Sequence, residues 1–205
     1  TENSGVIYRC DTTTFCDAAA DWTISLPAAY IGDGWIMSLA FDSTNGILYA
    51  GTGNGTGYIY RCDTTTNCDA AGDWTAAYNP AADRITSLVF DSQNGTIYAG
   101  SGTGGVIYRC DTATVGSCND SSDWSTSYDT TESYIYSLTF DSANGILYAG
   151  TDANGIIYRC DTATAGSCDD SGEWTTSYDT TETAVRSLTV DSQNGILYAG
   201  TRDGG

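Results

Sequence analysis

The sequence predicts an all-β fold: a β-propeller of four blades, each with four antiparallel strands, whose last blade is divided between the N- and C-termini. Three observations predict it. The phrase Tyr-Arg-Cys recurs from Tyr8, Tyr60, Tyr108 and Tyr158, at spacings of 52, 48 and 50 residues. Each period contains short apolar runs separated by turn residues. No segment keeps the apolar period of 3.6 residues that a helix needs. Periods of roughly 50 residues built from four short strands are typical of propeller blades.

The third repeat illustrates the four expected strands, over residues 134–140, 146–150, 156–160 and 174–178. Asn144 and Gly145 suit a tight hairpin turn between the first two strands, because both residues tolerate positive φ. The run at 146–150, Ile-Leu-Tyr-Ala-Gly, is apolar on both faces, so its sheet should be covered on both sides. A parallel β-helix fits less well because its coils are shorter, and stacked sandwiches would need more than one sheet per repeat.

The repeats predict one domain over residues 1–205. Residues 201–205 have the same repeat phase as residues 1–5, so the last blade should combine strands from both ends. Closure of this split blade within one chain is expected, since it would remove exposed sheet edges. The alternatives are a longer array, or completion by a second copy in a ring of eight blades or a fibre. The expected blades are 35–78, 84–128, 134–178, and 184–205 together with 1–26.

The eight cysteines form four close pairs, one in each repeat. This regular spacing predicts local disulfides. A zinc site fits less well, because five or seven residues separate the paired cysteines and the chain has no histidine. Disulfides indicate a protein outside the reducing cytosol, either secreted, periplasmic or attached to the cell surface. The predicted bridges are Cys10–Cys16, Cys62–Cys68, Cys110–Cys118 and Cys160–Cys168. The tryptophans that follow them, expected to pack between blades, are Trp22, Trp74, Trp124 and Trp174.

The chain is strongly acidic, with 26 Asp and Glu against 7 Arg and Lys and a net charge of −19. Such a surface repels phosphate backbones and anionic lipids, so neither nucleic acid nor a membrane surface is an expected partner. No apolar run is long enough to insert into a bilayer. The chain has no histidine and no lysine, which excludes Ser-His and Cys-His pairs and Schiff-base chemistry. A non-enzymatic protein is therefore expected.

Two positions on each expected first strand differ among the repeats, while the residue between them is always apolar and β-branched. Both positions share one face of the strand. The first strands of a propeller surround its central channel, so these side chains would ring one mouth. Aromatic and arginine side chains recognise sugars or peptides by stacking and paired hydrogen bonds. The alternative is neutral variation at solvent-facing positions. The ligand-binding candidates are Trp35, Met37, Arg84, Thr86, Tyr134, Tyr136 and Arg186.

Acidic residues precede these positions, roughly one in each repeat. Two such carboxylates could hydrolyse a glycosidic bond, and several could hold Ca²⁺ together with the acids of the cysteine loops. Solvated side chains are the simpler interpretation, and no cofactor is expected. The mouth candidates are Asp33, Asp83, Glu132 and Glu182; the loop acids are Asp161, Asp169, Asp170 and Glu173. Three glycosylation sequons, relevant only in a glycosylating host, lie at Asn54, Asn94 and Asn119.

The cadence Ser-Leu-x-Phe-Asp-Ser-x-Asn-Gly-x-Leu-Tyr-Ala-Gly-Thr, followed by Ile-Tyr-Arg-Cys-Asp and Asp-Trp-Thr, resembles the repeats of BNR and sortilin-type propellers. It is also similar to the propeller repeats of xyloglucan-degrading glycoside hydrolases. The resemblance covers all four repeats and implies a propeller fold. The Asp-box of that group is not intact here. The stretch 10–23 keeps the final Trp22-Thr23 but has a cysteine bracket in place of the Ser and Gly. The resemblance therefore does not carry an enzymatic activity over to this chain.

Together these features predict a non-enzymatic extracellular or cell-surface module for adhesion or filament assembly, with a channel mouth able to bind a ligand. Expected partners are a glycan or protein surface, or further copies joined by blade completion or edge docking. Tyrosines near the ends of the expected fourth strands would serve such docking. The alternative functions are a carbohydrate-binding, lectin-like module or a glycoside hydrolase-like enzyme. The docking tyrosines are Tyr30, Tyr78, Tyr128 and Tyr178.

Overall fold

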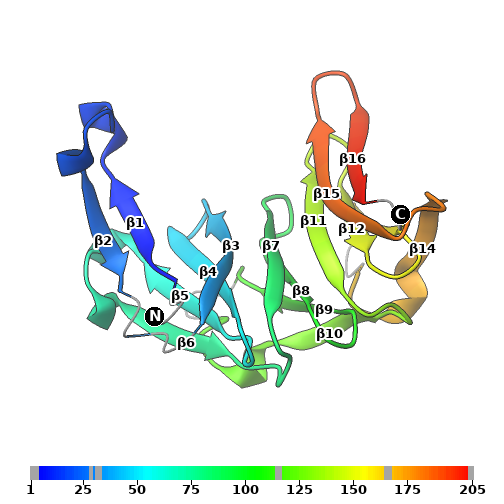
Figure 1. Ribbon diagram of the computed structural model, residues 1–205, viewed down its shortest axis with the longest axis horizontal. Helices are drawn as coiled ribbons and strands as arrows, with labels where there is room; N and C mark the ends of the chain where they lie inside the picture. Colours follow the sequence, from blue (N-terminus) through cyan, green and yellow to red (C-terminus); the bar gives the residue numbers. More distant parts are fainter. Residues whose placement is uncertain (1–4, 28–29, 31–33, 114–116, 164–167, 203–205) are drawn as a thin grey trace.

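The computed structural model describes residues 5–27, 30, 34–113, 117–163 and 168–202. It contains three complete four-stranded antiparallel sheets, arranged side by side along an arc (Figure 1). Blade 1 comprises β3 (Trp35–Asp42), β4 (Ile47–Gly53), β5 (Ile59–Asp63) and β6 (Trp74–Tyr78). Blade 2 comprises β7 (Ile85–Asp91), β8 (Thr96–Ser101), β9 (Val106–Asp111) and β10 (Ser125–Asp129). Blade 3 comprises β11 (Ile135–Asp141), β12 (Ile146–Thr151), β13 (Ile156–Asp161) and β14 (Trp174–Asp179).

These sheets confirm the predicted all-β fold of four-stranded propeller blades. The four strands expected in the third repeat are present, with ends shifted by at most one residue. The predicted hairpin turn is also formed, with Gly145 at φ 66°, but the expectation of positive φ at Asn144 is wrong. Asp141 stabilises this turn, because its carboxylate accepts from the Ala143 amide at 3.0 Å and from the Asn144 side chain at 2.7 Å. The only helices in the described ranges are 3₁₀ turns of three residues, and none has the length and apolar character of a membrane span.

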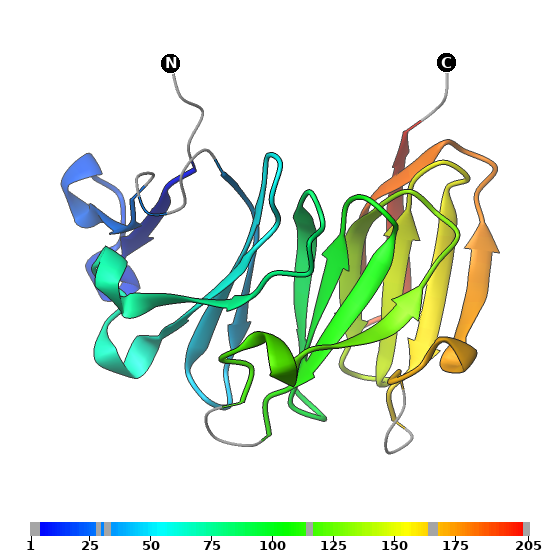
Figure 2. The same cartoon turned by 90° about the horizontal axis from the view of Figure 1, so that it is seen from below.

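The remaining strands form two half-blades at opposite ends of the arc (Figures 1 and 2). The N-terminal half-blade is β1 (Ile7–Cys10) paired with β2 (Trp22–Leu26), and the C-terminal half-blade is β15 (Ala184–Asp191) paired with β16 (Ile196–Arg202). The predicted division of the last blade between the termini is thus confirmed. The two halves do not pair with each other, however, so the closure expected within one chain is not formed.

Packing explains this arrangement. The N-terminal half-blade shares an apolar cluster with blade 1, through Ile7 and Leu26 against Cys62 and Trp74. The C-terminal half-blade packs on blade 3 through Val185 and its neighbours. Each half is therefore held by the blade next to it in the chain, and the arc keeps the two halves apart (Figure 2).

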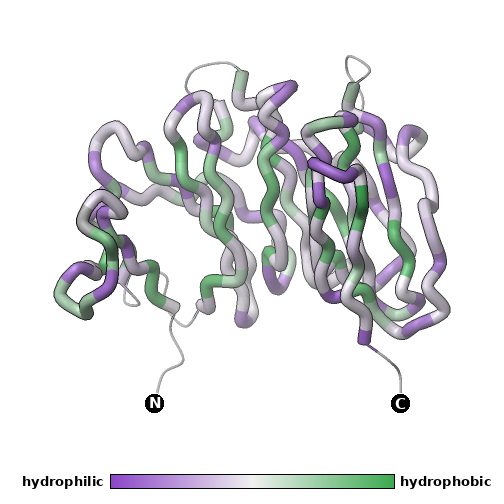
Figure 3. Tube along the Cα trace, turned by 90° about the horizontal axis from the view of Figure 1, so that it is seen from above, coloured by the Kyte–Doolittle hydropathy of each residue, from purple (hydrophilic) through white to green (hydrophobic). Residues whose placement is uncertain are grey.

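The contact between successive blades is repeated closely. Hydrophobic residues are concentrated on the strands (Figure 3), and buried apolar side chains of neighbouring blades form shared clusters. The glycine near the end of each second strand permits this packing: a Cβ added at Gly100 would lie 2.7 Å from Cγ2 of Ile135 in the next blade. Real Cβ atoms do not approach that closely, so a larger residue would push the two blades apart.

All four predicted disulfides are present. Trp74, Trp124 and Trp174 are buried between blades as expected, with exposed fractions of 1%, 7% and 5%. Trp22 is an exception to this prediction, since 48% of it is exposed. The reason is topological: a blade or half-blade precedes each of the other three tryptophans, but no described sheet covers the outer face of the N-terminal half-blade.

Candidate functional site

Four of the predicted mouth residues form a continuous stack: Arg84 and Tyr134 lie immediately before β7 and β11, Tyr136 lies on β11 and Arg186 lies on β15. The guanidinium carbon of Arg84 lies 5.6 Å from the ring centre of Tyr134. Tyr134 and Tyr136 stack with their ring centres 5.6 Å apart and their planes 6° apart. The Arg186 guanidinium lies over the other end, 3.7 Å from the ring centre of Tyr136. Cation–π contacts of this kind hold the side chains in fixed positions.

The other mouth candidates contribute unequally. Trp35 and Met37 on β3 remain 40% and 37% exposed, and Met37 lies close to Arg84 because both border Gly53. Thr86 is bound locally instead: its hydroxyl donates to the Gly100 carbonyl at 2.9 Å and also to the Ile135 carbonyl. Thr86 therefore joins two blades and does not present its hydroxyl to a ligand.

The carboxylates of two acidic candidates, Asp83 and Glu132, are engaged in local structure. Asp83 accepts from Arg84 Nε and from the Thr103 amide, both at 2.8 Å. Burial alone would raise the pKa of Asp83, but these hydrogen bonds outweigh it and the pKa lies below its ordinary value. Glu132 is 4% exposed, and its carboxylate accepts from the side-chain amide of Asn154 at 3.0 Å. Glu182 is half-buried, with its backbone amide bonded to Thr180 Oγ1 at 3.2 Å.

Asp33 lies outside the described residues. Within the described ranges, no group of three or more His, Cys, Asp or Glu side chains is arranged to hold a metal ion. Two of the loop acids instead stabilise the turn before Trp174: Asp170 accepts from the Gly172 amide at 2.6 Å, and Glu173 accepts from the Asp169 amide at 2.9 Å.

The sequon at Asn94 is also engaged in structure. Its side-chain amide donates to the Thr162 carbonyl of the next blade at 2.9 Å and to Asp91 at 2.8 Å. A glycan on this nitrogen would displace both hydrogen bonds.

The expected edge-docking tyrosines do not form a common outer edge. Tyr78 and Tyr128 are half-buried between blades, where they stack on the tryptophans of the following blades. Tyr30 lies beyond the end of β2, and its hydroxyl donates to the Trp74 carbonyl at 2.5 Å. Only Tyr178 is strongly exposed, at 63%.

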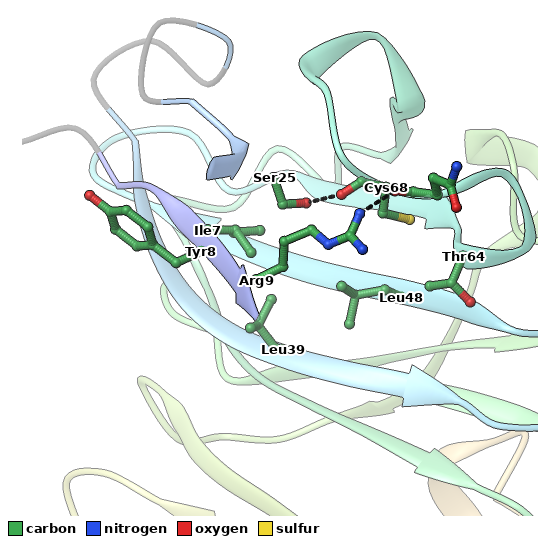
Figure 4. Close-up of a pocket in the computed structure, with 9 residues that line it drawn as sticks. Ile7, Tyr8, Arg9, Ser25, Leu39, Leu48, Thr64 and Cys68 are labelled. Atoms are coloured by element: carbon green, nitrogen blue, oxygen red, sulfur yellow. Dashed lines mark hydrogen bonds between the residues drawn. The ribbon is translucent and has the colours of Figure 1, made fainter. Parts of the chain in front are cut away.

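A pocket of about 250 Å³ opens between the N-terminal half-blade and blade 1 (Figure 4). One wall is β1 with Ser25, and the other is built from blade 1 and its cysteine loop. Two hydrogen bonds join the walls: Arg9 Nη1 donates to the Asn67 carbonyl at 3.0 Å, and Ser25 Oγ donates to the Cys68 carbonyl at 2.5 Å. Its lining residues are Ile7, Tyr8, Arg9, Ser25, Leu39, Leu48, Thr64, Asn67 and Cys68.

Exposed apolar side chains gather at the two ends of the arc. We call the first group the front face: Tyr8, Trp22, Ile24, Leu39 and Phe41, which are 48% to 57% exposed. The second group, the rear face, consists of Tyr178, Ile196 and Tyr198, which are 43% to 63% exposed. Most of these residues occupy repeat positions that are buried or half-buried inside the arc. The sequence analysis named Tyr178 as a docking residue but did not predict the other members of the two faces.

The blade architecture recurs in solved structures. One chain of a nidogen/laminin complex matches 98% of this chain and 68% of its own length, with a TM-score of 0.67 and 15% identity. One chain of the mitotic checkpoint complex matches 97% of this chain and 54% of its own length, with a TM-score of 0.63 and 15% identity. Both are β-propellers. The chain has the β-propeller fold. At this identity the likeness concerns the fold alone.

Neither the comparison with models of protein families nor the comparison with curated protein sequences gives a match. The two structural matches therefore show that the chain has a propeller fold but do not place it in a particular propeller family. The chain spans about half the length of the checkpoint-complex chain.

Proposed function

We propose that this protein is a non-enzymatic, extracellular or cell-surface structural module that self-associates through the two ends of its arc. The observation that carries the proposal is the pair of apolar faces at those ends. Contiguous apolar surface on a soluble protein marks an interaction site. Exposed strand edges at the half-blades add a second means of association, because unpaired backbone groups recruit further strands.

Two features support the extracellular setting. Four disulfides, one in each repeat, require an oxidising compartment to form and persist. The repeat cadence resembles that of BNR and sortilin-type propellers. We include membership of that group in the proposal. A role in adhesion would use the same apolar faces against a protein on another surface.

The absence of enzymatic activity is supported by the chemistry of the acidic candidates. A glycosidase needs one carboxylic acid with a raised pKa and a second carboxylate nearby. The carboxylates of Asp83 and Glu132 are occupied by Arg84, Thr103 and Asn154. The Glu132→Gln and Glu182→Gln variants test this point, since a polysaccharide hydrolysis that disappears in both would establish an enzyme.

Self-association is tested by sedimentation velocity and electron microscopy on the disulfide-bonded chain over a series of concentrations. The expected result is particles larger than one chain, increasing with concentration. Dispersed single chains at every concentration would refute the proposal. Because each copy carries a net charge of −19, added salt should strengthen association by screening the repulsion between copies.

A carbohydrate-binding module is the second candidate function, favoured by the stack of Arg84, Tyr134, Tyr136 and Arg186. Aromatic rings beside arginines suit the stacking and hydrogen bonding of sugars, acidic sugars above all. A polysaccharide array tests it. Binding that is lost in Arg186→Ala and retained in a rear-face variant such as Tyr178→Ala would support a glycan site at the mouth, and no binding to any polysaccharide would exclude it.

A further inference from the structure

The contacts between blades inside the chain supply a template for the exposed ends. One hydrogen bond occurs at every boundary between first strands. A leucine amide of the following strand donates to a serine hydroxyl of the preceding one. The three examples are Leu88 to Ser38 at 2.8 Å, Leu138 to Ser87 at 2.9 Å and Leu188 to Ser137 at 2.9 Å. The next members of this series are Leu39, on the front face, and Ser187, which is exposed on β15.

The aromatic contacts follow the same rule. Tyr78 of blade 1 stacks on Trp124 of blade 2, with ring centres 5.2 Å and planes 4° apart. Tyr128 of blade 2 stacks on Trp174 of blade 3 at 5.4 Å and 4°. In the same series, the rear-face Tyr178 corresponds to a tyrosine without its tryptophan. The front-face Trp22 corresponds to a tryptophan without its tyrosine.

The pocket beside β1 corresponds to an occupied position inside the arc. Between blades 1 and 2, Ile47 and Tyr49 of β4 lie in one apolar cluster with Leu88, Ile97 and Cys118 of the following blade. The equivalents of Leu88, Ile97 and Cys118 in the preceding repeat are Leu39, Leu48 and Cys68, which line the pocket (Figure 4). Leu39, Leu48 and Cys68 therefore form a site like the one that accepts Ile47 and Tyr49 between blades 1 and 2. On the rear face, Ile196 and Tyr198 are the side chains equivalent to Ile47 and Tyr49.

The edges of the half-blades are also complementary. In blade 1 the Thr52 amide donates to the Tyr58 carbonyl, on the side of the third strand. Amides of a strand alternate between its two sides, so the equivalent amides of β16, at Leu197, Ala199 and Thr201, point away from β15. Among the described strands, β16 has no partner on that side, and neither has β1 on the side opposite β2.

We infer that the partner at the front face is a second copy of this chain, whose C-terminal half-blade pairs with the N-terminal half-blade of the first copy to form one four-stranded blade. The inference rests on the proposed self-association and names its geometry. Blade 3 gives the register through the pairs Leu147–Cys160, Tyr148–Arg159 and Ala149–Tyr158. The composite blade accordingly pairs Leu197 with Cys10, Tyr198 with Arg9 and Ala199 with Tyr8 across the two chains.

Three further contacts follow across this interface. Tyr178 of one copy stacks on Trp22 of the other. The Leu39 amide of the second copy donates to Ser187 Oγ of the first. Ile196 and Tyr198 fill the pocket beside β1. The interface is heterologous, because the front face of one copy meets the rear face of the next, so it continues either into a closed ring or into a fibre.

The same chain is not the occupant of its own front face in this structure, because its two half-blades lie at opposite ends of the arc (Figures 1 and 2). Closure within one chain would bury the same side chains without any dependence on concentration. The experiment below separates the two cases.

The test uses two double variants of exposed residues. The front variant carries Trp22→Ala and Leu39→Ser, and the rear variant carries Tyr178→Ala and Tyr198→Ser. Each variant alone should self-associate at least about tenfold more weakly than the wild type, since every interface includes one damaged face. Mixed in equal amounts, they should form complexes of two chains and nothing larger. In such a complex the intact rear of the front variant meets the intact front of the rear variant.

Several results would overturn the inference. Failure of the mixture to form two-chain complexes, while the wild type still assembles, would place self-association on another surface and leave the proposed function standing. Wild-type assembly that both variants retain would have the same meaning. A wild type that stays monomeric would remove the proposed function as well. Tyr134→Ala is a matched control at the channel mouth and should assemble like the wild type.

A second variant tests the strand pairing separately. Ala199→Pro removes an amide that faces the free edge of β16, so the β15–β16 pair keeps its hydrogen bonds. Assembly should fall while the thermal stability of the single chain stays close to that of the wild type. Unchanged assembly of this variant would exclude pairing along β16.

Discussion

Trp124 provides the sharpest test of how side chains hold the blades together. Each tryptophan buried between blades meets one position on the fourth strand of the preceding sheet. Trp74 Nε1 donates to Ser25 Oγ at 3.2 Å, and Trp174 Nε1 donates to Ser127 Oγ at 3.1 Å. At the corresponding boundary the residue is Ala77, and the buried Trp124 Nε1 has no hydrogen-bond partner among the described residues.

The perturbation is Ala77→Ser. A buried donor without a partner costs about 1–3 kcal/mol, and a typical hydrogen bond contributes about 0.5–1.5 kcal/mol net. The same repeat position holds a buried hydroxyl in Ser25 and Ser127, so we expect a serine to be accommodated at Ala77. We expect the free energy of unfolding to increase by about 1 kcal/mol, which corresponds to about 2–4 °C in Tm for a chain of this length.

Urea and thermal unfolding monitored by tryptophan fluorescence provide the assay, with controls from the chain itself. Ala76→Ser is the same change on the exposed neighbouring position of β6 and should leave stability unchanged within about 0.5 kcal/mol. Ser127→Ala should destabilise by about 1–2 kcal/mol, since it deprives both Trp174 Nε1 and the Cys168 carbonyl of a partner. If Ala77→Ser is no more stable than the wild type while both controls behave as expected, the indole N–H of Trp124 already has a hydrogen-bond partner. That result would refute the prediction.

Two further predictions concern the disulfides and alkaline pH. Replacing Cys62 and Cys68 by serine should lower the free energy of unfolding by about 2 kcal/mol in urea denaturation, because the bridge closes a loop with a sequence separation of 6; an unchanged denaturation midpoint would contradict this. Burial raises the pKa of Tyr49 and Tyr98 to about 12, above about 10 in the unfolded chain. The contribution of these two tyrosines to the free energy of unfolding is therefore complete below about pH 10. It is lost as the pH rises from about 10 to about 12, with a slope of about 1.4 kcal/mol per pH unit for each tyrosine. Urea unfolding across this range measures the slope, which should decrease in Tyr49→Phe, and a stability independent of pH would refute the assignment.

Local chemistry explains why the blades and disulfides could be predicted. The turn Asp141–Gly145 needs an aspartate that binds its own backbone and a glycine at positive φ, and both are visible in the sequence. The cysteine pairs are close in the chain, so their bridges need no knowledge of the fold. For the mouth, alternation along the chain predicted that Tyr134 and Tyr136 share one face, and their rings do stack. The contacts that engage Thr86 and Glu132 come from outside their own strands and could not be predicted from the sequence.

The sequence by itself determined the repeating blade, its strands, its disulfides and the position of the split, because these depend on period, turn residues and spacing within a single repeat. Only the tertiary structure decided that the two half-blades remain apart. That outcome depends on how each blade packs against the next, because three complete sheets lie between the half-blades and together set the distance between them. It leaves Trp22 and Tyr178 exposed, although their counterparts Trp124 and Tyr78 stack on each other inside the arc. Equivalent positions of similar repeats thus differ in burial, since burial depends on the neighbour that a side chain contacts.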